Sequence, residues 1–201
     1  MVASQLRTVG VNDLEVVAAM ASVPRELFVP AGREALAYSD AAIPLGNGRA
    51  LMEPLVTGLL LTHARIESHE RVLIVGAGTG YTAMLIGRLA ARVVAVESDA
   101  ALAAQARATG VGIVDAELTA GAPDDGPYDV IYIDGAIERM PEALTAQLAN
   151  GGRVAAVVRD RGGVCRATVG RVVGDDIVGL AVIEIPAPLL PGFERAREFV
   201  F

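Results

Sequence analysis

From residue 71 onwards, short apolar runs rich in Val and Ile alternate with alanine-rich runs whose apolar residues recur at helical spacing. The apolar runs predict strands at residues 72–75, 93–96, 113–115, 130–133 and 154–158. The alanine-rich runs predict helices between them, at residues 81–90, 100–108 and 141–148. Strands that alternate with helices are typical of a parallel sheet covered on both faces. The pattern therefore predicts a doubly wound, mostly parallel α/β domain.

The segments on either side of this core follow other patterns. Ahead of it, Asn12 and Glu15 have the spacing of a helix-start capping pair, and a second helix is expected at residues 53–65. A flexible, glycine-flanked loop at residues 46–54 precedes that second helix. After the core, two strand-like runs separated by Gly174-Asp175-Asp176 predict a closing β-hairpin.

Composition fits one globular domain, because 53% of the 201 residues are hydrophobic and 20% are charged. A formal net charge of -7 without a cluster of arginines argues against nucleic acid as the main partner. The chain contains no lysine, which excludes both a P-loop lysine and a Schiff-base lysine.

The apolar runs are far shorter than the roughly 20 residues of a membrane span, and the N-terminus has no signal-peptide pattern. We therefore expect a cytoplasmic protein that does not enter the membrane.

The single cysteine, Cys165, is expected to be a small buried side chain, so neither redox nor zinc chemistry is indicated and no metal ligand is assigned. His63 and His69 are interpreted as surface or helix-end residues.

The strongest chemical signal is a buried strand that runs into the glycine turn Gly76-Ala77-Gly78-Thr79-Gly80 and then into a helix at Tyr81. Glycines let a backbone approach a ligand closely. Tyr81 stands where a dinucleotide fingerprint would have its third glycine, which favours a nucleoside with a small polar tail over a pyrophosphate. Glu97, 21 residues after Gly76, ends the next strand, where its carboxylate could accept hydrogen bonds from both ribose hydroxyls.

Two more acids follow predicted strands at the same edge of the sheet. Glu117 could accept a hydrogen bond from an adenine amino group, or it could be a solvated loop acid. Asp134 ends the fourth strand beside the glycine turn, where a role at the rim is favoured over simple solvation.

The chain as a whole resembles the protein-L-isoaspartate O-methyltransferase family, whose members use S-adenosylmethionine to methylate the abnormal carboxylate of isoaspartyl residues. The motifs that carry the resemblance are Gln5-Leu6-Arg7, Ala19-Met20, the run VPRELFVP at residues 23–30, residues 37–40, the loop 46–54, the strand and glycine turn 72–81, Pro127-Tyr128-Asp129 and Gly151-Gly152-Arg153. VPRELFVP joined to the glycine turn and Tyr81 is far more specific than the turn alone.

The resemblance implies S-adenosylmethionine as cofactor, a methyltransferase sheet of the Rossmann-like type and a protein or peptide substrate. The cofactor residues that it implies are Gly76, Ala77, Gly78, Gly80, Tyr81, Glu97, Ser98, Glu117, Leu118 and Asp134. Along residues 1–201 it implies a single domain, with a helical and loop segment on the substrate side at 1–70, a cofactor-binding core at 71–158 and a closing hairpin and tail at 159–201.

The loop 46–54 departs from the family pattern, and we take Arg49, Met52 and Glu53 as its candidate catalytic residues. Met52 stands where the family has a serine at the reaction centre, Ala50 replaces a threonine and Arg49 replaces a glutamine. Arg49 could offer a fixed fork of donors to an acceptor carboxylate, or it could be a solvated loop residue. In the glycine-turn strand, Ile74 replaces an acidic residue that helps to hold the cofactor's ammonium group.

An acceptor carboxylate is already ionised at pH 7, so methyl transfer to it needs positioning rather than a general base.

Three functions remain open from the sequence. The first is an active methyltransferase, on isoaspartyl residues or on another acceptor. The second is a catalytically weakened or inactive homologue that binds S-adenosylmethionine. The third is a nicotinamide-dependent oxidoreductase, which Tyr81 disfavours. The sequence does not determine the oligomeric state.

Overall fold

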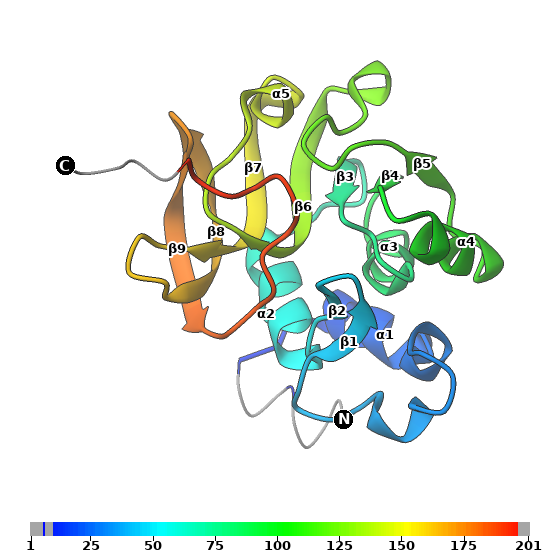
Figure 1. The fold of residues 1–201 in the computed structure, drawn as a ribbon. Helices are drawn as coiled ribbons and strands as arrows, with labels where there is room; N and C mark the ends of the chain where they lie inside the picture. Colours follow the sequence, from blue (N-terminus) through cyan, green and yellow to red (C-terminus); the bar gives the residue numbers. More distant parts are fainter. Residues whose placement is uncertain (1–5, 7–9, 197–201) are drawn as a thin grey trace.

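The computed structural model describes residue 6 and residues 10–196, and its centre is a mostly parallel β-sheet (Figure 1). The sheet has seven strands in the order β5-β4-β3-β6-β7-β8-β9. Strands β3 to β7 pair with one another in parallel, whereas β8 pairs antiparallel with both β7 and β9. The strand bounds are Arg71–Val75 for β3, Arg92–Glu97 for β4, Ile113–Asp115 for β5, Tyr128–Ile137 for β6, Leu148–Arg159 for β7, Cys165–Val173 for β8 and Asp176–Glu184 for β9. The doubly wound fold and its closing hairpin are confirmed.

Alternate residues of the central strands pack into two different hydrophobic layers, as the two-residue period of a strand requires. The layer on one face joins the strands to α1, α2 and α3. The layer on the other face joins them to α5, the segment after β5 and the C-terminal segment. The α-helix bounds are Leu14–Ser22 for α1, Pro54–Ala64 for α2, Tyr81–Ile86 for α3, Ala100–Ala108 for α4 and Glu142–Thr145 for α5. Short 3₁₀ helices, η3 to η5, cover Arg25–Phe28, Glu34–Leu36 and Pro123–Asp125.

All five predicted core strands are present, and α4 has the predicted bounds. The helix expected at residues 81–90 stops at Ile86, and the residues after it form hydrogen-bonded turns, in which Arg88 N donates to Leu85 O and Ala90 N donates to Ile86 O. The helix expected at residues 141–148 is confined to Glu142–Thr145. There the Gln147 side chain donates to the Ala120 and Ala143 carbonyls and accepts from Ala122 N, which fixes the turn into β7.

The N-terminal segment corrects two expectations. Asn12 is not the cap of α1; the cap is Asp13, whose carboxylate accepts from the backbone N–H groups of Glu15 and Val16. The loop at residues 46–54 is not wholly irregular, because its first half is a hairpin of β1 (Ile43–Gly46) and β2 (Arg49–Leu51). The turn residues Asn47 and Gly48 both have positive φ, 48° and 71°, as a tight two-residue hairpin turn requires.

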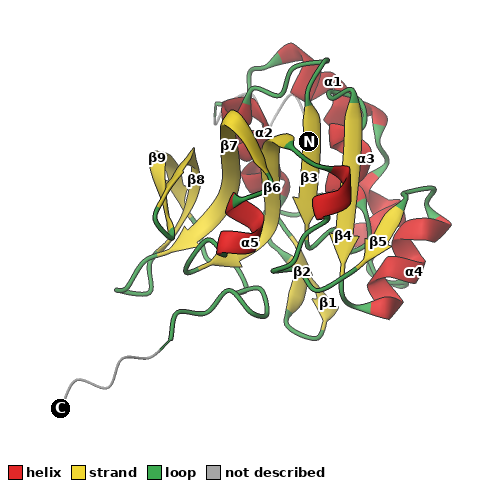
Figure 2. Ribbon diagram, turned by 90° about the horizontal axis from the view of Figure 1, so that it is seen from above, coloured by secondary structure: helices red, strands yellow, loops and turns green. Residues whose placement is uncertain are grey.

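This β1–β2 hairpin lies beyond the carboxyl ends of β3 and β4, as Figure 2 shows. The C-terminal segment reaches the same edge of the sheet, where Ala136 N donates to Pro188 O and Leu190 N donates to Ala136 O. Leu190 packs directly on Gly135, at which a Cβ atom would lie 2.7 Å from its side chain. Two segments far from the central strands in sequence therefore cover the edge at which an open α/β sheet binds its ligands.

Other sequence expectations concern single residues. Cys165 is half-buried rather than buried, at the start of β8. Gln5 and Arg7, which belong to the motifs of the family resemblance, lie outside the described residues. Within residues 10–196 no helix is long and apolar enough to cross a membrane.

Candidate active site at the carboxyl ends of the parallel strands

The glycine turn between β3 and α3 is built on three residues with positive φ. The φ angles of Gly76, Gly78 and Gly80 are 78°, 57° and 94°, a region that other residues rarely adopt. The N–H groups of Gly76 and Ala77 both donate to Val96 O, at 3.0 Å, which ties the turn to the end of β4. The turn thereby lies next to Glu97, the last residue of that strand.

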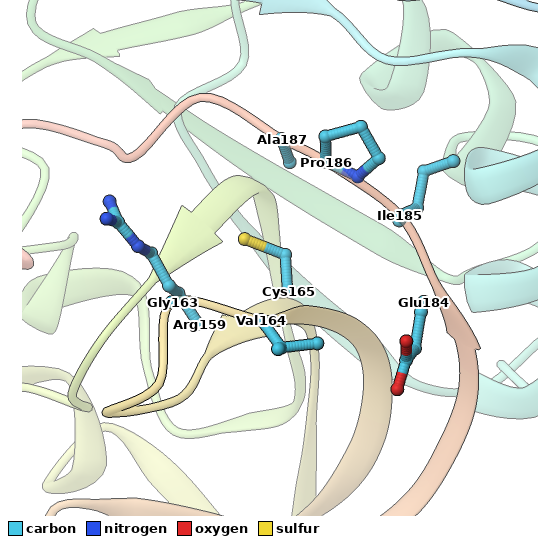
Figure 3. A pocket seen from close by; sticks show the side chains of 8 residues that line it. All are labelled: Arg159, Gly163, Val164, Cys165, Glu184, Ile185, Pro186 and Ala187. Carbon is cyan, nitrogen blue, oxygen red and sulfur yellow. The ribbon is translucent and has the colours of Figure 1, made fainter.

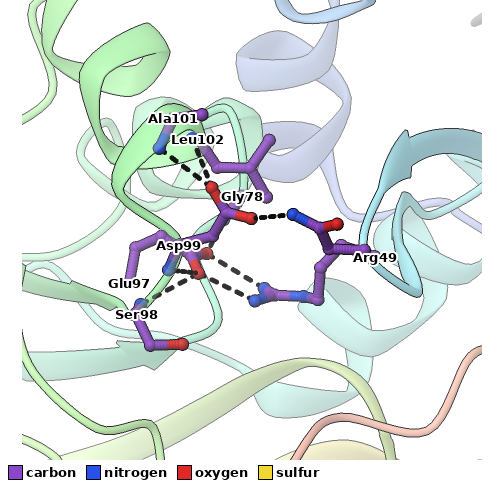
Figure 4. Close-up of polar contacts among 8 residues, drawn as sticks. Arg49, Gly78, Glu97, Ser98, Asp99, Ala101 and Leu102 are labelled. Atoms are coloured by element: carbon purple, nitrogen blue, oxygen red, sulfur yellow. Dashed lines mark hydrogen bonds and ion pairs between the residues drawn. The ribbon is translucent and has the colours of Figure 1, made fainter.

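Glu97 is fully buried and is bound to Arg49 of the β1–β2 hairpin (Figure 4). Arg49 Nη1 lies 2.7 Å from Glu97 Oε1, and Arg49 Nη2 lies 3.0 Å from Glu97 Oε2. Backbone N–H groups complete the set: Gly78 N donates to Oε2, and Ser98 N and Asp99 N donate to Oε1. This is the bidentate geometry in which a guanidinium binds a carboxylate most strongly.

A second contact ties the hairpin to the same place. Asn47 donates from its side-chain amide to Asp99 Oδ2 at 2.8 Å, while Asp99 Oδ1 caps α4 by accepting from Ala101 N and Leu102 N. The hydrogen bond from Asn47, together with the cap, holds the pKa of Asp99 below its usual range. The β1–β2 hairpin is thus fastened to the end of β4 by two neighbouring side-chain contacts.

Asp134 lies on β6 near this pair and is almost fully buried. Its Oδ2 accepts from Thr82 Oγ1 at 2.7 Å, while its Oδ1 is buried with no hydrogen-bond partner among the described residues. Burial raises the pKa of Asp134 to about 6, and the Thr82 hydrogen bond and the charges of Arg49 and Arg25 offset only part of that effect. A buried carboxylate oxygen without a donor is a candidate to receive one from a ligand.

Tyr81 joins the glycine turn to the N-terminal segment. Its ring lies under the guanidinium of Arg25, with Cζ 4.6 Å from the ring centroid, and meets Phe28 edge to face at 5.5 Å. Thr79 of the turn donates to Phe28 O at 2.7 Å. These contacts explain physically why the VPRELFVP run and the glycine turn with Tyr81 occur together in one sequence.

The three loop candidates have different surroundings. The Met52 side chain is 2% exposed and packs in the hydrophobic core, and Met52 O accepts from Arg25 Nη2. Glu53 lies just ahead of α2, and its pKa is raised by burial and by the nearby charge of Asp40. Arg49 directs its donors at Glu97 and not at an open loop, so a contact from Arg49 to an acceptor requires that it leave Glu97.

The remaining residues expected at a cofactor lie around the same edge. Leu118 is buried in the second hydrophobic layer, whereas Ser98 and Glu117 are exposed. Ile74, which was expected to replace an acidic residue, is fully buried in the core on β3 and offers no charge to a cofactor.

The sequence interpretation missed Arg25, Thr82 and Leu190 as neighbours of this site. Arg25 lies inside the VPRELFVP run and Thr82 directly follows Tyr81, so motifs already assigned to the site could have identified both. No motif in the sequence points to Leu190.

A separate shallow cavity of about 410 Å³ lies at the ends of β7, β8 and β9 (Figure 3). Its lining includes Arg159, Cys165, Glu184 and Pro186. Glu184 is paired with Arg166 rather than directed at a ligand. The cavity shares no lining residue with the cluster around Glu97.

Comparison with known proteins identifies the family of this sequence. Residues 1–168 match the family model described as Protein-L-isoaspartate(D-aspartate) O-methyltransferase. A protein of Methanoculleus marisnigri named protein-L-isoaspartate O-methyltransferase is 40% identical over 168 residues, which cover 80% of this chain and 76% of that protein. One of the same name from Herpetosiphon aurantiacus is 39% identical over 167 residues, which cover 80% and 75%.

Solved structures agree on the fold. A protein-L-isoaspartate O-methyltransferase superposes with a TM-score of 0.77 at 24% identity, over 92% of this chain and 63% of that one, so this chain matches less than two thirds of its length. A putative protein-L-isoaspartate O-methyltransferase of Plasmodium falciparum, in complex with S-adenosyl-L-homocysteine, superposes with a TM-score of 0.75 at 16% identity, over 92% and 94%. At these identities the likeness concerns the fold alone.

Proposed function

The chain belongs to the protein-L-isoaspartate(D-aspartate) O-methyltransferase family, and from this premise we propose that it transfers the methyl group of S-adenosylmethionine to the carboxylate of isoaspartyl residues in proteins. The observation that carries the proposal is the buried carboxylate of Glu97, which stands at the end of β4 beside a glycine turn of three positive-φ residues. A nucleoside binds an open α/β sheet at such a place.

The residues around Glu97 fit S-adenosylmethionine in their chemistry. Gly76 and Gly78 allow a close backbone approach, Glu97 offers two acceptor oxygens for a ribose diol, and Leu118 offers an apolar wall. The unpartnered Oδ1 of Asp134 fits an ammonium group and offers a carboxylate near the position where Ile74 supplies none. Ser98 and Glu117 are exposed at the rim, where the adenosine end would lie.

When bound, S-adenosylmethionine supplies an electrophilic methyl group on a sulfonium centre. The chain's own residues then have to hold an acceptor oxygen in line, since the acceptor carboxylate is already ionised near pH 7. The loop supplies no hydroxyl for this purpose at Met52 or Ala50, and the Met52 side chain packs inward. Positioning therefore falls to the backbone of the loop and to Arg49 and Glu53, the polar side chains on either side of Met52.

The same reasoning supports a role in the repair of damaged proteins, with isoaspartyl proteins or peptides as partners and the cytoplasm as the site of action. Both curated relatives reported above carry the name of the active enzyme. That agreement favours an active enzyme over a catalytically inactive homologue. Membership of a methyltransferase family likewise argues against a nicotinamide-dependent oxidoreductase.

The test is transfer of a labelled methyl group from S-adenosylmethionine to an isoaspartyl peptide, with the same peptide containing ordinary aspartate as the matched control. The expected result is labelling of the isoaspartyl peptide alone. Glu97→Gln should lower the rate at limiting cofactor by roughly 10- to 100-fold, the effect of losing one charge-assisted contact. Cofactor binding without any labelling would contradict the proposed acceptor, and equal labelling of both peptides would contradict its specificity.

A further inference from the structure

The guanidinium of Arg49 occupies the space directly in front of the glycine turn. A Cβ atom placed on Gly76 would lie 2.8 Å from Arg49 Nη2 and 3.2 Å from the side chain of Leu190. The side chains of Arg49 and Glu97 are 4% and 0% exposed, so the pair is shielded from solvent on all sides. The surface of the turn that lacks side chains, and could admit a ligand, is therefore covered by two side chains of the same chain.

Arg49 also takes both oxygens of the carboxylate that a ribose would need. Each oxygen of Glu97 accepts one donor of the guanidinium, in addition to the backbone N–H groups of Gly78, Ser98 and Asp99. Those three N–H groups would still hold the carboxylate if Arg49 left. The two vacated acceptor positions lie side by side, which suits two neighbouring hydroxyls as well as it suits the two parallel N–H groups of an arginine.

From this geometry, and resting on the proposed function, we propose that Arg49 is an intramolecular competitor of the cofactor: its guanidinium holds the ribose position on Glu97 until S-adenosylmethionine displaces it. Arg49 is thus a residue that sets cofactor affinity, in addition to the residues that contact the cofactor. The apparent affinity is proportional to the fraction of molecules in which Glu97 is free, so pairing with Arg49 lowers it.

The placement of Arg49 makes this displacement physically accessible. It stands on a two-stranded hairpin whose strands pair with each other and not with the seven-stranded sheet. The backbone of the hairpin is held by the core packing of Ile43 and Leu51 and by the hydrogen bond from Asn47 to Asp99, whereas the arginine side chain has several rotatable bonds. Release of Glu97 therefore requires a local change at the hairpin and leaves the central sheet intact.

The experiment is isothermal titration of the full chain with S-adenosylhomocysteine, comparing the wild type with Arg49→Gln and Arg49→Met. Both variants should bind at least tenfold more tightly, because neither side chain can pair with Glu97 in the bidentate manner. Arg33→Gln, which removes the same charge at an exposed position, is the matched control and should stay within threefold of the wild type. Equal or weaker binding by both Arg49 variants overturns the proposal.

A double-mutant cycle tests whether Arg49 acts through Glu97. In a Glu97→Gln background, removing Arg49 should change the affinity by less than threefold, because the competition is for the carboxylate. A full tenfold gain in that background overturns the proposal, as does a structure of the complex in which Arg49 and Glu97 remain paired. Absence of binding by every variant overturns both the competition and the proposed cofactor. Tighter binding by the Arg49 variants, together with no labelling of the isoaspartyl peptide by the wild type, supports the competition and contradicts only the proposed acceptor.

Discussion

Arg25 lies over the ring of Tyr81 while its Nε donates to Ala37 O at 2.7 Å and its Nη2 donates to Met52 O. This one fully buried guanidinium therefore joins the 3₁₀ helix η3, the start of α3 and the loop that carries the candidate catalytic residues. Burial lowers the pKa of Arg25, and the nearby Tyr81 and Asp134 offset part of that cost. The N-terminal segment is consequently fixed to the glycine turn by specific contacts and not only by apolar packing.

Arg25→Ala should lower the free energy of unfolding by about 2–4 kcal/mol, because it removes a stacking contact and leaves two buried carbonyl groups without a donor. Urea unfolding measures the change. Arg33→Ala, an exposed arginine eight residues away in sequence, is the control and should cost less than about 0.5 kcal/mol. Equal effects of the two substitutions would contradict the structural role of Arg25.

Asp134 should make stability depend on pH in a stated direction. Its pKa is about 6 in the folded protein, above the usual 3.8, so the folded state binds a proton more readily than the unfolded state. The stabilisation of the folded state by protonation of Asp134 is fully present below about pH 4 and is lost as the pH rises through about 6.

Asp134→Asn cannot titrate, so its free energy of unfolding should rise relative to the wild type by about 2–3 kcal/mol between pH 4 and pH 7.5. Urea unfolding at several pH values measures this difference. Asp175→Asn, on the exposed turn of the β8–β9 hairpin, is the control and should show a difference that stays constant. A constant difference for Asp134→Asn as well would show that Asp134 titrates in the same way in both states.

Met52→Ser should destabilise the protein without raising methyl transfer. The Met52 side chain packs in the hydrophobic core, so a serine leaves a cavity and buries a hydroxyl, at a cost of about 2–5 kcal/mol. Met52→Leu keeps the volume and should cost less than about 1.5 kcal/mol. Thermal unfolding and labelled methyl transfer are measured on the same samples. A folded Met52→Ser protein with a clearly higher rate on the isoaspartyl peptide would restore the serine position as a determinant of activity.

Arg65→Gly should stabilise the protein. Arg65 ends α2 with a φ of 50°, a left-handed conformation that glycine adopts without the steric cost of a Cβ atom. We expect a gain of about 0.5–1 kcal/mol in the free energy of unfolding. The matched substitution Gln105→Gly, at an exposed position within α4, should have the opposite sign and cost about 0.5–1 kcal/mol. A loss of stability in both variants would mean that Arg65 makes a contact that outweighs its backbone strain.

The sequence alone determined the central sheet, because its signals are local. The strand from Arg71 to Val75, the glycine turn after it and the acid at position 97 follow from hydrophobic period and short spacing. The Asn47-Gly48 dipeptide is also a local hairpin signal, since both residues favour positive φ, and the interpretation of residues 46–54 as a loop overlooks it. The family resemblance rested on equally local motifs.

Only the tertiary structure decided which side chains meet. Arg49 and Glu97 are 48 residues apart, and nothing in the loop sequence distinguishes an arginine bound to that carboxylate from one in solvent. The same holds for Leu190 on Gly135 and for Met52, whose inward packing depends on α2 and on the N-terminal segment. The physical reason is that helices and strands form through hydrogen bonds and hydrophobic periodicity among residues close in sequence. The partner of a charged or apolar side chain instead depends on how those helices and strands pack against one another.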